Sequence, residues 1–425
     1  MPGGRTLAEW LAYQETLHPQ SIDLGLERVH AVAARLGLLP PAGRTAIVGG
    51  TNGKGSTATL LAALAQAHGA RVGLFTSPHL LRYQERIRIA GEEVEDAALC
   101  AAFEQIEAVR APESLTYFEF NTLAALLVFR SAAVDLTVLE VGLGGRLDAT
   151  NLIDADVAVL CSVAMDHRDW LGDTLEAIGA EKAGIFRAGR PVVLGNAQMP
   201  ATVMNALAAL GNKPLVAGED FSWQVHADGR WDLRGAGLDG HSLPPPALYG
   251  EIQYCNAATA LAALPYLLAP RALDPKAVGE ALRAVRLPGR MQFVDGAVEW
   301  VFDVAHNEAA AAVLAAQLRA RPVRGRTLAV FGALGDKDVG AVARQLDAQV
   351  DHWLVCTLPG PRALGPVELQ QRMGTLRGTC ELAGEVVAAT ALAAAQARTG
   401  DRVLVCGSFH TVGPALAARR LYSGF

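Results

Sequence analysis

The stretch GGTNGKGST at residues 49–57 carries the residue types of a phosphate-binding loop. Such a loop surrounds phosphate oxygens with backbone N–H groups at a helix N-terminus, and adds a lysine as a point charge and a hydroxyl for a metal ion. The usual pattern places Ser or Thr directly after the lysine, whereas here Gly55 separates Lys54 from Ser56. The flanks still fit, because TAIVGG before the loop predicts a buried strand and the Ala/Leu-rich segment after it predicts a helix.

Other reactive side chains follow further strand-like runs. Glu140 ends the run LTVLE, Asp166 and His167 follow CSVAM, and Glu181 with Lys182 comes shortly afterwards. Ligands bind at the carboxyl ends of the strands in an open parallel sheet, so we expect these groups to meet there. Glu and His with a further oxygen ligand could hold Mg²⁺, although this ion prefers carboxylates and water to imidazole. Taken singly, a loop histidine and a solvated Glu–Lys pair are the ordinary interpretations.

A similar group stands later in the chain. VFDVAHNEAA places Asp303, His306 and Asn307 between a predicted strand and a predicted helix. Asn307 is also a typical helix N-cap residue. The sequence therefore leaves open whether Asn307 serves a ligand or only the helix.

Composition excludes several classes of protein. The chain has 425 residues, a net charge of −6 and no basic run, so we expect two domains and no nucleic-acid partner. Its apolar runs are too short for a membrane span, and the N-terminus lacks the apolar core of a secretion signal. The six cysteines lie far apart without a CxxC pair, which is typical of reduced thiols. We expect a soluble cytoplasmic protein.

The order of the elements predicts an α/β fold. Strand-like runs alternate with Ala/Leu-rich helical segments, which indicates βαβ units and a doubly wound, mostly parallel sheet. Residues 218–246 break this rhythm and predict a small hairpin excursion. The rhythm restarts after Pro288 and Gly289, so we predict a loop-bearing domain at 1–289 and a smaller, Rossmann-like α/β domain at 290–425.

A series of motifs identifies a family. In order along the chain they are GGTNGKGST, TSPHL, LTYFEF, LEVGLGGRLDATN, DHRDWLG, EKAGIF, LPGRMQ, FDVAHN, DKD and VCGSFHT. This series resembles the folylpolyglutamate synthases, especially the bacterial bifunctional dihydrofolate synthase/folylpolyglutamate synthases, which are relatives of the Mur ligases. The resemblance covers nearly the whole chain. It also accounts for Gly55, because the phosphate-binding loops of these families have a small residue between the lysine and the Ser or Thr.

The resemblance implies an ATP-dependent acid–amino-acid ligase. Such an enzyme adds L-glutamate to 7,8-dihydropteroate and to reduced folates such as tetrahydrofolate, through an acyl phosphate. It implies ATP and two Mg²⁺ ions as cofactors. The expected partners are these small molecules alone, with no membrane, and we expect a monomer.

The resemblance also assigns site residues. Ser77 and Glu140 would hold one Mg²⁺, and His167 with Lys182 the other, with Lys182 matching a lysine that becomes carbamylated. The expected catalytic residues are Lys54, Glu140, His167, Lys182 and His306. The expected ATP-binding residues are Thr51, Asn52, Gly53, Lys54, Gly55, Ser56, Asn256, Arg290 and Asp303.

Three segments match the dihydropteroate-binding positions of the family. They contribute Ile22, Asp23 and Leu24; Thr116, Tyr117, Phe118 and Glu119; and Leu147, Asp148 and Ala149. A flat ring could stack on Phe118 while Asp23 or Asp148 binds its polar edge. Phe118 could equally be a core residue. Glu308 departs from the proline common at this position in related sequences, and a helix start accepts either residue.

Three alternative functions remain. The enzyme could be a monofunctional folylpolyglutamate synthase. A Mur-type cell-wall ligase would need a further N-terminal domain, and only about 45 residues precede the loop. A nucleotide-dependent switch would have little use for Glu140, His167 and Lys182 together.

Overall fold

The computed structural model describes residues 4–41, 43–235, 239–360 and 362–422. Its largest sheet has eight strands in the order β4-β3-β2-β5-β1-β6-β7-β8. The strands are β1 (Arg44–Gly49), β2 (Val72–Phe75), β3 (Ile87–Ile89), β4 (Glu92–Glu93), β5 (Leu136–Glu140), β6 (Val157–Leu160), β7 (Val192–Leu194) and β8 (Leu215–Val216). Pairing is parallel from β2 through to β8, and only β3 pairs antiparallel, with β2 on one side and with the edge strand β4 on the other. The predicted mostly parallel sheet is confirmed.

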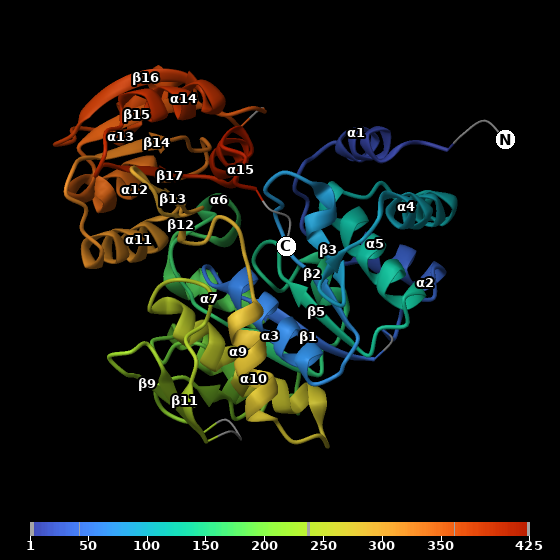
Figure 1. Cartoon of the computed structure of the whole chain (residues 1–425). Coiled ribbons are helices and arrows are strands. Elements are labelled where there is room, and N and C mark those ends of the chain that lie inside the picture. Colours follow the sequence, from blue (N-terminus) through green and yellow to red (C-terminus); the bar gives the residue numbers. More distant parts are fainter. Residues whose placement is uncertain (1–3, 42, 236–238, 361, 423–425) are drawn as a thin grey trace.

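Helices cover both faces of this sheet (Figure 1). One face packs against α3 (Lys54–Ala67), α9 (Ile252–Leu268) and α10 (Pro275–Ala284). The apolar core on the other face includes residues of α1 (Leu7–Leu17), α2 (Glu27–Arg35), α4 (Asp96–Arg110), α5 (Tyr117–Ser131), α7 (Leu175–Ala183) and α8 (Ala201–Ala209). Because the central strands are buried on both faces, they appear in the sequence as continuous apolar runs.

The break at 218–246 is a three-stranded antiparallel sheet. Its strands are β9 (Ser222–Val225), β10 (Trp231–Arg234) and β11 (Gly240–Leu243). Trp231 is buried, and its indole N–H donates to the carbonyl of Pro244 at 2.8 Å. The predicted hairpin excursion is therefore confirmed, and Phe221, Trp231, Leu233 and Leu243 pack it into the apolar core that includes α9.

The last third of the chain forms a second sheet, shown in orange and red in Figure 1. Its order is β12-β13-β17-β14-β15-β16. The strands are β12 (Gln292–Val294), β13 (Glu299–Phe302), β14 (Thr327–Phe331), β15 (His352–Thr357), β16 (Thr379–Glu385) and β17 (Arg402–Cys406). Only β12 pairs antiparallel. The two faces are covered by α11 (Glu308–Ala320), α12 (Val339–Leu346) and α13 (Pro366–Met373), and by α14 (Val386–Gln396) and α15 (Phe409–Ala418).

The chain passes from the first sheet to the second between α10, which ends at Ala284, and β12, which begins at Gln292. The predicted domain boundary at 289/290 falls in this connection and stays a prediction. Within the described ranges, no helix is both long and apolar enough to cross a membrane.

Candidate active site

The phosphate-binding loop has the predicted strand–loop–helix geometry. β1 ends at Gly49 and α3 begins at Lys54, with Gly53 as its N-cap at φ 86°. A side chain at Gly53 would be strained at this φ, and its Cβ would lie 2.9 Å from Asn256 Oδ1. The first N–H groups of α3 have no acceptor within the helix, which makes this helix start an anion site.

Two lysines converge on the loop. Lys54 Nζ donates to the carbonyls of Gly50 at 3.0 Å and Thr51 at 3.1 Å, and Lys182 Nζ donates to the same Gly50 carbonyl at 3.1 Å. Lys182 is only 4 % exposed. Burial, and then the charge of Lys54, lower the pKa of Lys182 to about 7. Near neutral pH a substantial fraction of Lys182 is therefore the free amine, which is the nucleophilic form.

Glu140 stands at the end of β5 beside the loop. Its Oε2 accepts the backbone N–H of Ser77 at 3.0 Å, and its side chain is buried. Burial raises the pKa of Glu140 although Lys54 and the Ser77 N–H oppose this effect. A Cβ at Gly55 would lie 3.4 Å from Glu140 Oε2, so the glycine inserted after Lys54 lets this carboxylate approach the helix start.

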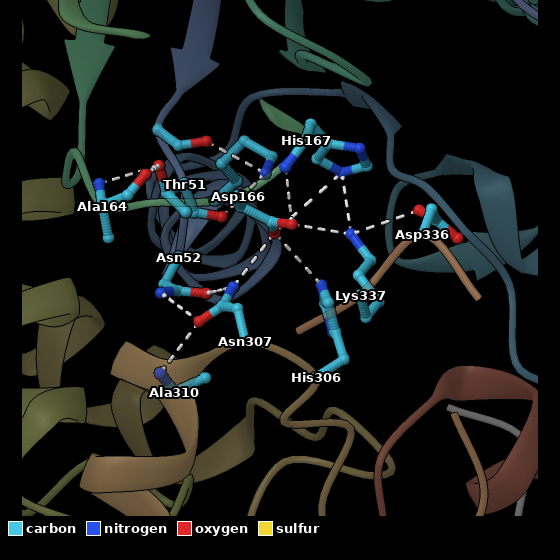
Figure 2. Close-up of polar contacts among 12 residues, drawn as sticks. Thr51, Asn52, Ala164, Asp166, His167, His306, Asn307, Ala310, Asp336 and Lys337 are labelled. Carbon is cyan, nitrogen blue, oxygen red and sulfur yellow. Dashed lines mark hydrogen bonds and ion pairs between the residues drawn. The ribbon is translucent and has the colours of Figure 1, made fainter. Parts of the chain in front are cut away.

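Asp166 is contacted by three side chains of the second domain (Figure 2). It accepts from Lys337 Nζ at 2.7 Å and from Asn307 Nδ2 at 3.0 Å, and His306 Nε2 lies 3.5 Å away. Burial disfavours the carboxylate, but the hydrogen bond from His306 and the charge of Lys337 hold the pKa of Asp166 well below its usual range. Asp166 is therefore an anion that binds the second domain to the end of β6.

His167 adopts the left-handed conformation at φ 51°, as the N-cap of the short helix α6 (Arg168–Leu171). Its Nε2 lies 3.3 Å from Lys337 Nζ. Burial and the charge of Lys337 lower the pKa of His167 to about 4. The imidazole is thus neutral at physiological pH, which is the form that binds metals.

The predicted metal ligands lie around the loop but make different contacts. Ser77 reaches Glu140 through its backbone N–H, Lys182 binds the loop carbonyl, and His167 faces Lys337. No group of three His, Cys, Asp or Glu side chains in the described residues is arranged to hold a metal. The predicted set differs from such groups because it includes a serine and a lysine that is expected to be carbamylated. The buried Glu140, with Ser77 as its hydrogen-bond donor, fits a cation at this place.

Arg290 enters the site from the interdomain connection. Its guanidinium lies 4.9 Å from the ring of Phe409, and its Nη1 is buried without a hydrogen-bond partner in the described structure. Burial lowers the pKa of Arg290. Arg290, Glu140, Ser77, Gly55 and Phe409 all line a cavity of about 30 Å³. An anionic ligand such as a nucleotide phosphate would satisfy this arginine.

Asp303 and Asn256 make mainly structural contacts. Asp303 accepts the backbone N–H groups of Met291 and Ala305, each at 2.8 Å, and burial raises its pKa. Asn256 Oδ1 accepts from Thr57 Oγ1 at 3.4 Å beside Gly53. Asp303 thus holds the backbone next to Arg290, and Asn256 supports the first turn of α3.

Two of the three predicted pterin segments meet at Arg28. This arginine contacts Asp23 at 2.7 Å and Glu119 at 3.3 Å. Thr116 and Glu119 form the capping box of α5, in which Glu119 Oε2 accepts the Thr116 N–H at 2.7 Å. Arg28 follows the predicted residues Ile22, Asp23 and Leu24 closely in the chain, but the sequence predicted no role for it.

The remaining pterin positions divide into packed and partly exposed residues. Asp148 is the buried N-cap of the 3₁₀ helix η2 (Ala149–Leu152) and accepts the N–H groups of Leu143 and Thr150. The ring of Phe118 packs 5.7 Å from that of Phe75 and is half-buried. Ile22, Leu24, Tyr117 and Leu147 are also half-buried, and Ala149 is buried.

Comparison with known proteins decides the family. The Mur ligase middle domain matches residues 48–227, and the Mur ligase glutamate ligase domain matches residues 289–409. The dihydrofolate synthase/folylpolyglutamate synthase of Escherichia coli (strain K12) is 45 % identical over 406 residues, covering 96 % of this chain and 94 % of the relative. The chain belongs to the dihydrofolate synthase/folylpolyglutamate synthase family.

Solved structures of the dihydrofolate synthase/folylpolyglutamate synthase family share its fold. E. coli FolC in complex with DHPP and ADP is 44 % identical, with a TM-score of 0.92 over 98 % of this chain and 99 % of that chain. A bifunctional folylpolyglutamate synthase/dihydrofolate synthase with Mn, AMPPNP and L-glutamate bound is 44 % identical, with a TM-score of 0.90 over 98 % of each chain. The predicted family and its Mur ligase fold are confirmed.

The sequence predicted no role for Lys337, although the DKD motif that contains it is one of the family motifs. Lys337 is almost fully buried and binds Asp166. The signal in the sequence was a lysine between two aspartates after a predicted strand, which is also typical of a solvated turn. Asn307 is the N-cap of α11, as its residue type suggested, and it also contacts the loop residue Asn52.

Proposed function

We propose that this chain is an ATP-dependent ligase that adds L-glutamate to 7,8-dihydropteroate and to reduced folates through an acyl phosphate. The observation that carries the proposal is the convergence of Lys54, Glu140 and Lys182 with Arg290 from the interdomain connection around one loop. Relatives that share the fold have been solved with DHPP, ADP, AMPPNP, Mn and L-glutamate. A switch that only bound a nucleotide would not need this set.

The chemistry requires activation of a poor electrophile. Transfer of the γ-phosphoryl group of ATP to the substrate carboxylate creates an acyl phosphate, and the neutral amine of glutamate then attacks the carbonyl carbon while phosphate leaves. Both steps place negative charge on oxygens near the start of α3. Lys54, the N–H groups of α3 and Arg290 are the groups that stabilise this charge.

Divalent cations complete the site. Ser77 with Glu140, and His167 with Lys182, are the pairs that would hold two Mg²⁺ ions. When bound, these ions neutralise phosphate charge and polarise the phosphoryl group. An ammonium is a poor neighbour for a cation, so we infer that Lys182 is carbamylated: its free amine adds to carbon dioxide, forms an N–C bond and releases a proton. The resulting carbamate supplies an oxygen ligand.

Substrate recognition rests on both domains. The half-buried ring of Phe118 would stack on the pterin, and Asp23 or Asp148 would bind its polar edge. Contacts of Asp166 with Lys337 and Asn307 support closure over the acyl phosphate, which keeps water away. We further infer a monomer that works in the cytoplasm, where its six free cysteines stay reduced.

Ligation assays test the proposal. ADP release and glutamate incorporation are measured with dihydropteroate, tetrahydrofolate or a UDP-muramyl substrate, each with and without glutamate. We expect products from both pterin substrates. Ligation of tetrahydrofolate alone would reduce the function to a monofunctional folylpolyglutamate synthase. Ligation of the UDP-muramyl substrate would indicate a Mur-type enzyme, and ADP release without any product would indicate a switch.

A further inference from the structure

The segment between β2 and β3 buries Arg86, which forms no ion pair with a carboxylate in the part of the chain that the structure describes. Arg86 ends the 3₁₀ helix η1 (Tyr83–Arg86) and is 9 % exposed. Among the residues that the structure describes, no Asp or Glu oxygen forms an ion pair with it within 4.0 Å. A buried charge without a partner is costly, so its presence points to an anionic ligand.

The immediate contacts of Arg86 leave donors unused. Its Nε donates to His79 Nδ1 at 2.8 Å, and its guanidinium lies 5.9 Å from the ring of Tyr83 and 5.5 Å from that of Tyr117. Because an arginine can only donate, His79 Nδ1 must accept, and the neutral imidazole carries its proton on Nε2.

Nearby carboxylates already have other partners. Glu85 accepts the backbone N–H groups of Leu80 at 2.7 Å, Leu81 at 2.8 Å and Arg82 at 2.6 Å. Glu140 accepts the Ser77 N–H. Across the interface, burial and then the charges of Arg362 and Arg86 lower the pKa of His410, so this imidazole is neutral and adds no negative charge here. The surroundings of Arg86 thus favour an anion.

The position of Arg86 indicates which anion it would bind. The guanidinium of Arg86 lies 5.5 Å from the ring of Tyr117, in the predicted pterin segment, and its backbone carbonyl accepts the N–H of Thr76, the residue before Ser77 at the phosphate end. Dihydropteroate has one carboxylate, and that carboxylate reacts. A folate has a reacting γ-carboxylate and also an α-carboxylate, which must fit between the ring and the phosphate site. We propose that Arg86 and His79 bind the α-carboxylate of the glutamyl residue of a folate substrate. This inference rests on the proposed function.

This assignment makes Arg86 a specificity residue for glutamate extension but not for dihydrofolate synthesis. It is tested by ligation kinetics with dihydropteroate, tetrahydrofolate and a tetrahydrofolate whose α-carboxylate is an uncharged amide. The enzymes are wild type, Arg86→Gln, Arg86→Lys and the control Arg82→Gln. Arg82 lies in the same segment, but its side chain is 51 % exposed and pairs with Glu93.

For Arg86→Gln we expect kcat/KM for tetrahydrofolate to fall on the order of 10- to 100-fold, as for the loss of a charge-assisted hydrogen bond. The value for dihydropteroate should change less than about threefold, since that substrate lacks the second carboxylate. For the wild-type enzyme, kcat/KM should be lower by a similar factor for the amide than for tetrahydrofolate. For Arg86→Gln, the kcat/KM values for these two substrates should be equal. Arg86→Lys should keep part of the preference, and Arg82→Gln should keep all of it.

Three results would overturn the inference: equal losses on both substrates, wild-type enzyme that ligates the amide as well as the acid, or a loss confined to the KM for glutamate. If Arg86→Gln does not fold, by circular dichroism and thermal melting, then Arg86→Lys and the amide substrate decide. Wild type that ligates no pterin substrate would instead refute the proposed function itself.

Discussion

The side-chain amides of Asn52 and Asn307 exchange two hydrogen bonds across the two domains. Asn52 Nδ2 donates to Asn307 Oδ1 at 3.2 Å, and Asn307 Nδ2 donates to Asn52 Oδ1 at 3.0 Å (Figure 2). Asn307 also caps α11 by accepting the Ala310 N–H at 3.0 Å. The nucleotide loop is therefore attached to the first turn of a helix in the second domain.

Replacing Asn307 by Ser tests this attachment. Serine keeps a cap acceptor for α11 but removes the amide that pairs with Asn52 and Asp166. We expect kcat/KM for ATP to fall on the order of tenfold, with little change in melting temperature. Steady-state kinetics in a double-mutant cycle with Asn52→Ala measure the coupling, and additive losses would contradict it. Asn307→Ala, which also loses the cap, should cost about 1 kcal/mol more in stability.

Lys54→Ala should remove a charge from the phosphate site while the fold remains intact. Its Nζ contacts only loop carbonyls in the described structure. We expect turnover to fall on the order of 100-fold or more, because the negative charge that develops during phosphoryl transfer is no longer stabilised by a fixed cation. Single-turnover ligation checks this loss, with circular dichroism as the control for folding. Near-normal turnover of the purified variant would show that the loop does not act on phosphates.

Carbamylation of Lys182 predicts chemical rescue. Lys182→Ala should lose activity, and acetate or propionate at high concentration should restore part of it by supplying the missing oxygen ligand. The same carboxylates should not restore Lys54→Ala, which lacks a cation instead. Carbon-13 NMR of wild type in labelled bicarbonate should show a carbamate signal that Lys182→Ala lacks. Absence of both rescue and signal would contradict the modification.

The neutral state of His79 predicts a pH dependence of stability. Its pKa is lowered from 6.5 to about 4 in the folded state. The unfolded chain therefore binds more protons between these values, and stability falls as pH drops from about 6.5 to about 4. At about 1.4 kcal/mol per pKa unit, the contribution is at most about 3 kcal/mol. Denaturant unfolding of wild type and His79→Gln from pH 4 to 7 measures it, and parallel curves would contradict it.

Phe118→Ala tests whether both activities share one pterin position. Loss of a stacking contact of about 1 kcal/mol should raise the KM for dihydropteroate about fivefold. We expect a smaller effect on tetrahydrofolate, because a longer substrate must place its ring differently to present its γ-carboxylate. Equal effects on both substrates would indicate one shared ring position. The control is Phe120→Leu, because Phe120 is fully buried in the core next to this segment.

The sequence by itself determined the local elements and the loop chemistry. An apolar run, a glycine cluster and an Ala/Leu-rich segment predicted β1, the loop and α3 correctly, because each depends on periodicity and backbone freedom within a few residues. Glu140 and His167 could be named because they lie at or shortly after strand ends at one edge of a parallel sheet. Lys182 lies inside α7, and its role was expected from the family resemblance.

Only the tertiary structure decided which of these residues touch. Asn52 meets Asn307 and Asp166 meets Lys337 over separations of 255 and 171 residues, and no local pattern encodes such pairs. Burial is also a property of the assembled chain: it lowers the pKa of Lys182 to about 7 and leaves Arg86 without a carboxylate partner in the described residues. From the sequence alone, a lysine or an arginine is expected to be a solvated cation. The free-energy cost of burying its charge arises only when the fold removes water from the side chain.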